Sequence, residues 1–366
     1  MDNGFIMTYN TLSLFAGCGG MGLGLIGGFE FLGTFYEKNP FLIQQAFDFD
    51  SKAVQMYNEN FSHKCEVKNV LDLQNSEVMD HDIMIGGFPC QSFSIAAQNP
   101  KRLGYKDDKG KLFFEMCRIL IAKQPRCFIA ENVKGILSAN KGDAFNLVIS
   151  AFESCGYLVR YSLLNSKNYG VPQKRERVFI VGFKNKSDAN NFDFPRPTVD
   201  ENYVPIKRIL EPKCDIKNEY FFSEKAVQGL LKTKNYKSMN KGRAQNIEEP
   251  CNTVSSHLAK VSLNSTDPVL LDNGKYRMFS PREVARIQSF PESYKLAESR
   301  ITNYKAIGNA VPPVMMWHVA RAVLNSFKQK KPLVSFSKIQ PTLNIKSKIE
   351  YENCNSNQLI KEKCCY

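Results

Sequence analysis

The first half of the chain alternates short apolar runs with stretches in which apolar residues recur every three or four positions. The apolar runs predict strands at Thr11–Phe15, His81–Ile85 and Cys127–Ala130. The periodic stretches predict amphipathic helices at Leu112–Lys123 and Asp143–Phe152. Because strands that alternate with helices are typical of parallel βα units, we expect an α/β fold built on a doubly wound sheet.

Beyond Phe183 the pattern changes to a stretch rich in asparagine, lysine and proline, which predicts a smaller and irregular domain. A helix pattern returns at Ser280, where Pro281 takes the first helical position and Glu283 completes a capping box. A last amphipathic helix is expected over residues 313–328.

These changes predict four parts of the chain. Residues 1–184 form the main domain, residues 185–290 the smaller domain, and residues 291–328 a return segment that completes the main domain. Residues 329–366 form a basic, loosely ordered tail.

Composition narrows the function classes. The 366 residues include no apolar run of about 18, and the first residues do not resemble a secretory signal, so we expect a cytoplasmic protein. Eleven cysteines in no regular spacing, with four histidines, predict reduced thiols and no metal site. A net charge of +13 favours a polyanionic partner, although a solvated basic surface explains the charge equally well.

The most informative cysteine is Cys90, which follows a buried strand in the sequence Phe-Pro-Cys-Gln. Pro89 cannot continue the strand ladder, so the thiol leaves the sheet in one defined direction and is placed to attack a substrate. The alternative is a small buried hydrophobic side chain. Glu131 at the end of the next apolar run, together with Arg175 and Arg177 at the start of a later one, favours a single site with Cys90.

A glycine-rich loop directly follows the first expected strand, from Phe15 through Gly17, Gly19 and Gly20. Its spacing is not that of a P-loop and matches the usual dinucleotide pattern only approximately, which favours a nucleoside without a pyrophosphate. Close packing of the strand against a helix is the alternative reason for such glycines. Asp48 ends the second expected strand and is the candidate acceptor for ribose hydroxyls, with an insertion in the segment 28–45 before it.

The motifs of residues 11–325, and their order along the chain, resemble those of the DNA cytosine-5 methyltransferases of the bacterial restriction-modification type. The segment 87–94 is similar to the nucleophile loop of that family, and residues 131–133 resemble its cytosine-binding motif. The segment 173–177 resembles its arginine motif, and residues 308–312 resemble the segment that closes its cofactor site. The smaller domain then falls where the family has its target recognition domain.

The resemblance implies a fold of the S-adenosylmethionine-dependent methyltransferase type and a covalent mechanism. Cys90 would add to carbon 6 of a cytosine flipped out of double-stranded DNA, and Glu131 would stabilise the ring at N3. Arg177 would hold the exocyclic oxygen of the ring, and Arg175 would help to place a loop or a phosphate. A cognate restriction endonuclease is the implied functional partner of a monomeric enzyme.

The resemblance also assigns residues to the cofactor and to DNA. The expected contacts with S-adenosyl-L-methionine are Phe15, Gly17, Gly19, Gly20, Asp48, Phe49, Asn69, Val70, Pro89, Leu112, Asn309 and Val311. Many members of the family carry Asp-Ile where this chain has Asn69-Val70, so Asp72 stays open as the partner of adenine. The expected DNA contacts are Ser94 and Arg102, in a basic loop that closes over the base, and Thr253 in the recognition domain.

Three other functions remain open at this stage. An RNA cytosine methyltransferase of the same lineage shares the motifs, and a catalytically idle DNA-binding regulator shares the fold. A thiol hydrolase of another class needs a histidine partner, and the four histidines show no arrangement that supplies one.

Overall fold

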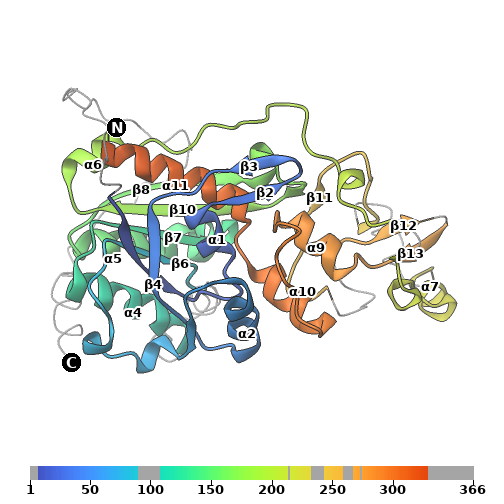
Figure 1. Cartoon of the computed structure of the whole chain (residues 1–366), viewed down its shortest axis with the longest axis horizontal. Helices are drawn as coiled ribbons and strands as arrows, with labels where there is room; N and C mark the ends of the chain where they lie inside the picture. Colours follow the sequence, from blue (N-terminus) through green and yellow to red (C-terminus); the bar gives the residue numbers. More distant parts are fainter. Residues whose placement is uncertain are drawn as a thin grey trace.

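The computed structural model describes residues 7–89, 108–212, 215–231, 243–258, 267–272 and 274–328. Its centre is a seven-stranded sheet in the order β5-β4-β1-β6-β7-β10-β8 (Figure 1). The strands are β1 Tyr9–Leu14, β4 Phe41–Asp48, β5 Cys65–Val67, β6 Ile83–Gly86, β7 Cys127–Val133, β8 Leu158–Asn165 and β10 Glu176–Phe183. The strands expected from the apolar runs are therefore confirmed.

The expectation of purely parallel units is wrong for one strand. β10 pairs antiparallel with both of its neighbours, β7 and β8, whereas the other pairs in the sheet are parallel. Residues 166–175, which join β8 to β10, hold a single-turn helix and the two-residue strand β9 Gln173–Lys174. Because a parallel return needs a longer crossover, usually a helix, the chain comes back in the opposite direction.

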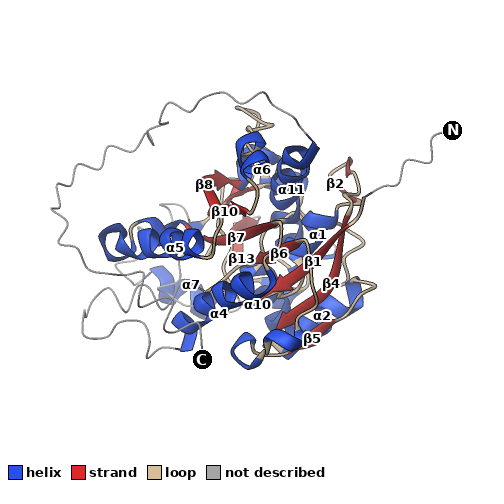
Figure 2. Ribbon diagram, turned by 90° about the vertical axis from the view of Figure 1, so that its left-hand side faces the viewer, coloured by secondary structure: helices blue, strands red, loops and turns tan. Residues whose placement is uncertain are grey.

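Helices cover both faces of the sheet (Figure 2). α1, α6 and α11 lie on one face, and α4 and α5 lie on the other. The helices are α1 Gly20–Ile26, α2 Ser51–Asn60, α4 Asp108–Lys123, α5 Asp143–Ser154, α6 Lys186–Asn191, α7 Glu224–Leu231, α9 Pro281–Ile287, α10 Arg300–Asn309 and α11 Pro313–Lys328.

The central strands are buried on both faces because their neighbouring residues pack against different helices. In β10, Phe179 and Val181 belong to the apolar cluster that includes α11, whereas Val178 and Ile180 belong to the cluster that includes α4 and α5. This follows the two-residue period of a strand. A doubly wound architecture with a mostly parallel sheet is thus confirmed.

The smaller elements include two hairpins and a short parallel pair. β2 Phe29–Phe31 and β3 Thr34–Tyr36 form a hairpin within the expected insertion before Asp48. β12 Leu270–Asp272 pairs with β13 Lys275–Arg277, and β9 pairs in parallel with β11 Cys251–Asn252. At α9, Ser280 caps the helix and Glu283 completes the capping box, as expected.

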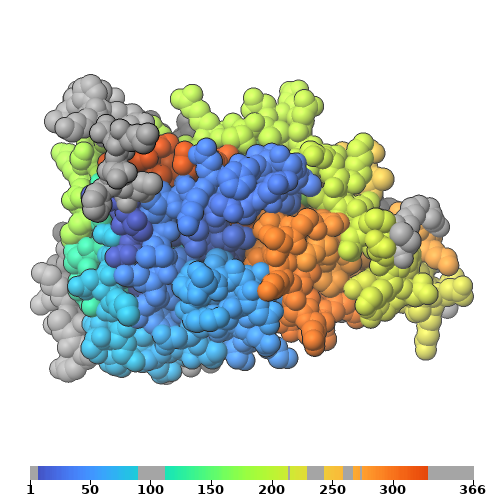
Figure 3. Space-filling view, viewed as in Figure 1, coloured from blue at the N-terminus to red at the C-terminus, as the bar shows by residue number. Residues whose placement is uncertain are grey.

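A third apolar cluster crosses the boundary expected at residue 290. It joins Val254 and Phe279 to Tyr304 of α10, and it also includes Cys18 of the glycine-rich loop. The surfaces of α2 and α10 meet on one side of the molecule (Figure 3). The described part of residues 185–290 therefore shares a core with residues on either side of it. The division of the chain into four parts stays a prediction.

Candidate active site

The predicted functional residues gather at one edge of the sheet. β1, β4, β6 and β7 are parallel, so their carboxyl ends lie at the same edge. The glycine-rich loop follows β1, and Asp48 is the last residue of β4. Glu131 lies near the end of β7, and the segment 87–89, which leads to Cys90, follows β6.

A buried ion pair joins Glu131 to Arg177. The Nε atom of Arg177 lies 2.9 Å from Oε1 of Glu131, and each side chain is 12% exposed. β10 runs antiparallel to β7 in a register that places Arg177 opposite Val133. Glu131 lies two residues before Val133 and therefore on the same face of the sheet, so this register brings Glu131 and Arg177 together. The strand direction that differs from the expectation therefore builds the pair.

Burial shifts the pKa of both members of this pair. It raises the pKa of the Glu131 carboxyl, against the charges of Arg177 and Arg175, which lower it. Burial also lowers the pKa of Arg177, against the attraction of Glu131. The Glu131 site therefore favours the protonated carboxyl more than water does, as a hydrogen-bond donor requires.

The chain that leads to Cys90 is anchored beside this pair. The Asn132 side chain donates a hydrogen bond of 3.0 Å to the carbonyl of Phe88. A Cβ atom on Gly87 would lie 3.1 Å from Oε2 of Glu131, so the backbone passes directly over the carboxyl group. Glu131 is thus close to the described residues that immediately precede Cys90, which itself lies outside the described ranges, as do Ser94 and Arg102.

Arg175 is buried against backbone carbonyls and does not face a substrate. Its side chain is 2% exposed, and its guanidinium donates to the carbonyls of Val254, Gly308 and Ala310 over 3.0 to 3.1 Å. Burial, with the charge of Arg177, lowers its pKa. These contacts fit the expectation that Arg175 places a loop, and they leave it too buried to contact a phosphate.

The glycines of the loop after β1 divide into two kinds. A Cβ on Gly20 would lie 2.4 Å from the carbonyl of Val311, and one on Gly19 would lie 2.3 Å from the Phe61 ring. These two glycines are needed for packing within the protein, which was the alternative interpretation. Gly17, at φ +55°, has no atom within 4 Å of its Cβ position and leaves open space beside the loop.

Asp48 connects this loop to the end of β4. Its Oδ2 accepts a 2.8 Å hydrogen bond from the amide of Gly17, and its Oδ1 accepts one of the same length from the amide of Asp50. Burial raises the pKa of Asp48, and these amides lower it. Each carboxylate oxygen has a second lone pair, so Asp48 can still accept from ribose hydroxyls.

The other expected cofactor residues lie along the same edge. The Phe49 ring is 70% exposed, and the Phe15 ring lies against Gly86 at the end of β6.

Asn69 uses its side-chain oxygen to accept from the amide of Leu71 and caps a short helix that contains Val70 and Asp72. Pro89 and Leu112 are half-buried, Asn309 is exposed and Val311 is buried.

Thr253 is exposed beside β9. Its hydroxyl donates to the carbonyl of Lys174 over 2.9 Å, and Lys174 is paired with Glu249. The segment that follows β11 is thereby held next to β9.

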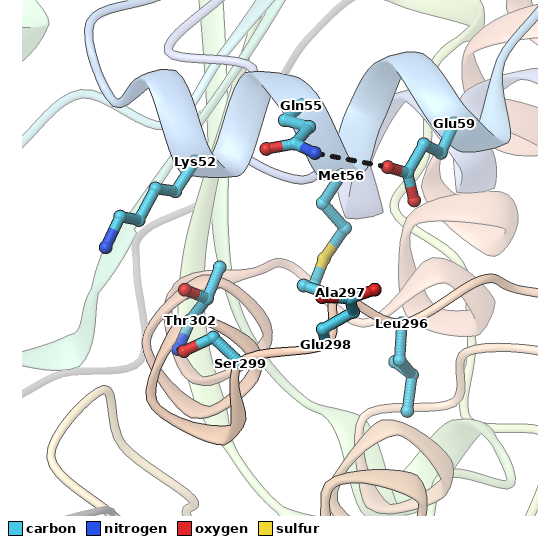
Figure 4. Close-up of a pocket in the computed structure, with 9 residues that line it drawn as sticks. All are labelled: Lys52, Gln55, Met56, Glu59, Leu296, Ala297, Glu298, Ser299 and Thr302. Carbon is cyan, nitrogen blue, oxygen red and sulfur yellow. Dashed lines mark hydrogen bonds between the residues drawn. The ribbon is translucent and has the colours of Figure 1, made fainter.

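A pocket of about 440 Å³ lies between α2 and the start of α10 (Figure 4). Its lining residues are Lys52, Gln55, Met56, Glu59, Leu296, Ala297, Glu298, Ser299 and Thr302. None of these residues is among those expected to bind the cofactor or DNA. Among the described residues, no group of three or more potential ligand side chains could hold a metal ion.

No helix in the described ranges has both the length and the apolar character needed to cross a membrane.

Comparison with known proteins agrees with this site. The family model for C-5 cytosine-specific DNA methylases matches residues 9–325. The chain belongs to this family. It is an enzyme, a DNA cytosine-5 methyltransferase.

Two relatives illustrate the extent of the match. The type II methyltransferase M1.ScrFI of Lactococcus lactis subsp. cremoris is 34% identical over 88% of this chain and 80% of its own length. The type II methyltransferase M.HaeII of Haemophilus aegyptius is 35% identical over 87% of this chain and 93% of its own length.

Solved structures show the same fold. A methyltransferase of Entamoeba histolytica superposes with a TM-score of 0.70 at 15% identity, covering 88% of this chain and 100% of its own. The Dnmt2 methyltransferase of S. pombe superposes with a TM-score of 0.65 at 18% identity, covering 88% of this chain and 98% of its own.

Sequence reasoning missed one residue beside the site, Gln288. Gln288, at the end of α9, is fully buried and bonded to Gln173 and to two carbonyls near the end of α10. A polar residue that ends a helix pattern gives no sequence signal of such contacts.

Proposed function

We propose that this methyltransferase modifies a specific cytosine in double-stranded DNA through a transient bond between Cys90 and the base. The observation that carries the proposal is the buried Glu131–Arg177 pair next to the segment that leads to Cys90. Family membership supports the reaction, and the pair supports the roles of the residues.

The roles follow from the electronic demand of the ring. Carbon 5 of cytosine is a weak nucleophile, so the Cys90 thiolate adds to carbon 6 and its electron pair moves the ring electrons towards carbon 5 and N3. Glu131, carrying a proton, donates to N3, and Arg177 donates to the exocyclic oxygen. Carbon 5 would take the methyl group from the sulfonium of the donor, which would leave as a thioether. A base then removes the proton from carbon 5, the carbon–sulfur bond to Cys90 breaks, the thiolate leaves, and Glu131 takes back its proton from N3.

Carbon 6 is inaccessible in a stacked duplex, so the cytosine must leave the helix before it reacts. The Glu131 carboxyl supports this step because a buried donor at N3 reads the Watson–Crick edge, which is free only in a flipped base. Ser94, Arg102 and Thr253 stay predicted as DNA contacts.

The methyl donor that we propose is S-adenosyl-L-methionine, whose sulfonium group supplies an electrophilic methyl. The described residues fit this group. Gly17 leaves open space beside the loop after β1, Asp48 offers acceptor capacity for ribose hydroxyls, and the exposed ring of Phe49 offers a surface for adenine. A cognate restriction endonuclease is the partner that we propose for an enzyme of this type.

Replacing Asp48 with alanine is expected to weaken the affinity for S-adenosylmethionine by about 10-fold to 100-fold, because hydrogen bonds to a charged group contribute roughly 1.5–3 kcal/mol. Isothermal calorimetry measures this change. Asp50→Ala is the matched control, since Asp50 caps α2 and pairs with Lys305 but is no expected cofactor contact. Equal affinities for the two variants would reassign the ribose contact.

Bisulfite sequencing tests the proposed function directly. DNA from cells that express the protein is expected to contain cytosines protected from conversion, all within one short recurring sequence, whereas DNA from cells with the empty vector should contain none there. Methyl transfer in vitro to a duplex with that sequence, compared with transfer RNA, separates the DNA enzyme from the RNA alternative. Transfer to RNA alone would contradict the proposal.

A further inference from the structure

Three buried polar side chains link parts of the protein that are far apart in the sequence. Gln173 and Gln288 are fully buried, and Arg175 is 2% exposed. The Nε2 atom of Gln173 donates to Oε1 of Gln288 over 2.8 Å. We call these three residues the clamp, because together they hold two backbone segments.

The first segment is 251–258, which carries Thr253. The clamp binds both backbone polar groups of Val254: its amide donates to Oε1 of Gln173 over 2.9 Å, and its carbonyl accepts from Arg175 over 3.0 Å. The pairing of β11 with β9 fixes the start of the same segment.

The second segment is 307–311, which includes the expected cofactor residues Asn309 and Val311. Gln288 donates to the carbonyls of Ile307 and Ala310 over 2.7 and 3.3 Å. Arg175 donates to the carbonyls of Gly308 and Ala310 over 3.1 and 3.0 Å. Ile307 and Gly308 lie in the last turn of α10, and Ala310 follows the helix. The carbonyl of Ile307 also accepts from the amide of Ala310, and the clamp adds side-chain donors at this helix end.

The two segments also touch each other and the glycine-rich loop. A Cβ on Gly308 would lie 2.3 Å from the carbonyl of Ser255, and a Cβ on Gly20 would lie 2.4 Å from the carbonyl of Val311. The glycines therefore let the backbones pass in direct contact, with no space for a side chain between them. Because packed interiors resist deformation, a displacement of segment 251–258 is expected to reach segment 307–311 and then the loop after β1.

We propose that the clamp couples the binding of DNA at segment 251–258 to the binding of the methyl donor at segment 307–311, with Gln288 as its central positioning residue. The inference rests on the proposed function. It gives Arg175 a role distinct from that of Arg177: Arg177 pairs with Glu131 at the reacting base, whereas Arg175 holds the backbone on which both ligands act. Coupling requires that each ligand favours the same arrangement of the two segments.

The test compares Gln288→Met with Tyr304→Phe. Methionine conserves the volume of Gln288 but removes its hydrogen bonds to Gln173, Ile307 and Ala310. Tyr304 lies in the apolar cluster that also contains Val254, and its hydroxyl donates to the carbonyl of Phe279. Its variant therefore removes a buried hydrogen bond outside the clamp. Calorimetry measures the affinity for S-adenosylhomocysteine alone and in the presence of the duplex identified by bisulfite sequencing.

The duplex is expected to raise the affinity of the unaltered protein, and this enhancement is expected to fall at least about fivefold in Gln288→Met. It should stay within about twofold of the original in Tyr304→Phe, so a general loss of stability cannot explain the change. An unchanged enhancement in folded Gln288→Met, or no enhancement in the unaltered protein, would overturn the proposal. Gln173→Met breaks the same contact from its other side and should show the same loss.

Hydrogen exchange gives a test that needs no variant. Adding the duplex alone, without cofactor, is expected to slow amide exchange in residues 303–311 of the unaltered protein. Unchanged exchange there would also overturn the clamp. Methyl transfer by the unaltered protein is measured first: its absence would refute the proposed function, whereas normal transfer without coupling would refute the clamp alone.

Discussion

Replacing Cys90 with serine is expected to lower the rate of methyl transfer by on the order of 10⁴-fold or more, because removal of the nucleophile blocks the covalent route. A serine hydroxyl is far less acidic than a thiol and supplies almost no anion at neutral pH. Affinity for S-adenosylmethionine should stay within a few-fold, since Gly17 and Asp48 are bound to each other and unaffected. Transfer of tritium from labelled cofactor to the duplex measures the rate, and calorimetry measures the affinity.

Cys155→Ser is the matched control for this variant. Cys155 lies in the apolar cluster under α4 and α5 and is not one of the expected site residues, so its variant makes the same exchange of sulfur for oxygen outside the site. Its turnover should stay close to that of the unaltered protein. Near-normal turnover in Cys90→Ser would remove Cys90 from the mechanism.

The second large effect is expected for Glu131→Gln, with a loss of turnover of about 10²- to 10⁴-fold, the usual contribution of an acid–base group. The amide keeps the shape of the side chain and can still accept from Nε of Arg177, but it cannot transfer a proton to N3. Glu176→Gln is the control, because Glu176 lies on the neighbouring strand β10, next to Arg177, and pairs with Lys134 at the surface. Comparable losses in both variants would show a general effect of charge on this part of the sheet.

The same variant also tests the protonation of the site. Because the folded-state pKa of Glu131 is raised above its ordinary 4.5, the fold favours the protonated carboxyl. This stabilisation is fully present below pH 4.5 and is lost as the pH rises through the folded-state pKa. Thermal melting should therefore show Glu131→Gln gaining stability relative to the unaltered protein from pH 4.5 towards neutrality, and a constant difference would contradict the raised pKa.

Much of the fold could be predicted because its signals are local. The capping box at Ser280 and Glu283 placed α9, and apolar periodicity gave both ends of α11. The direction of β10 could not be predicted in this way, because it depends on the short connection after β8 and on pairing between distant strands.

The candidate site was predictable as a set of motifs but not as a geometry. Glu131 and Arg177 were expected together, and they form an ion pair. Arg175 lies two residues from Arg177 and was grouped with it, yet it contacts carbonyls from residues 254 to 310. Such long-range contacts leave no pattern near the residue itself, and the same holds for Gln288.

The most direct measurement of the central claim is covalent trapping. A duplex that carries 5-fluorocytosine at the target position is incubated with the protein and S-adenosylmethionine, and the product is digested and sequenced by mass spectrometry. Fluorine on carbon 5 cannot be removed as a proton can, so the adduct should persist, with the base attached to Cys90. A duplex that is methylated normally with cytosine but forms no adduct with 5-fluorocytosine, or an adduct on another residue, would contradict the account.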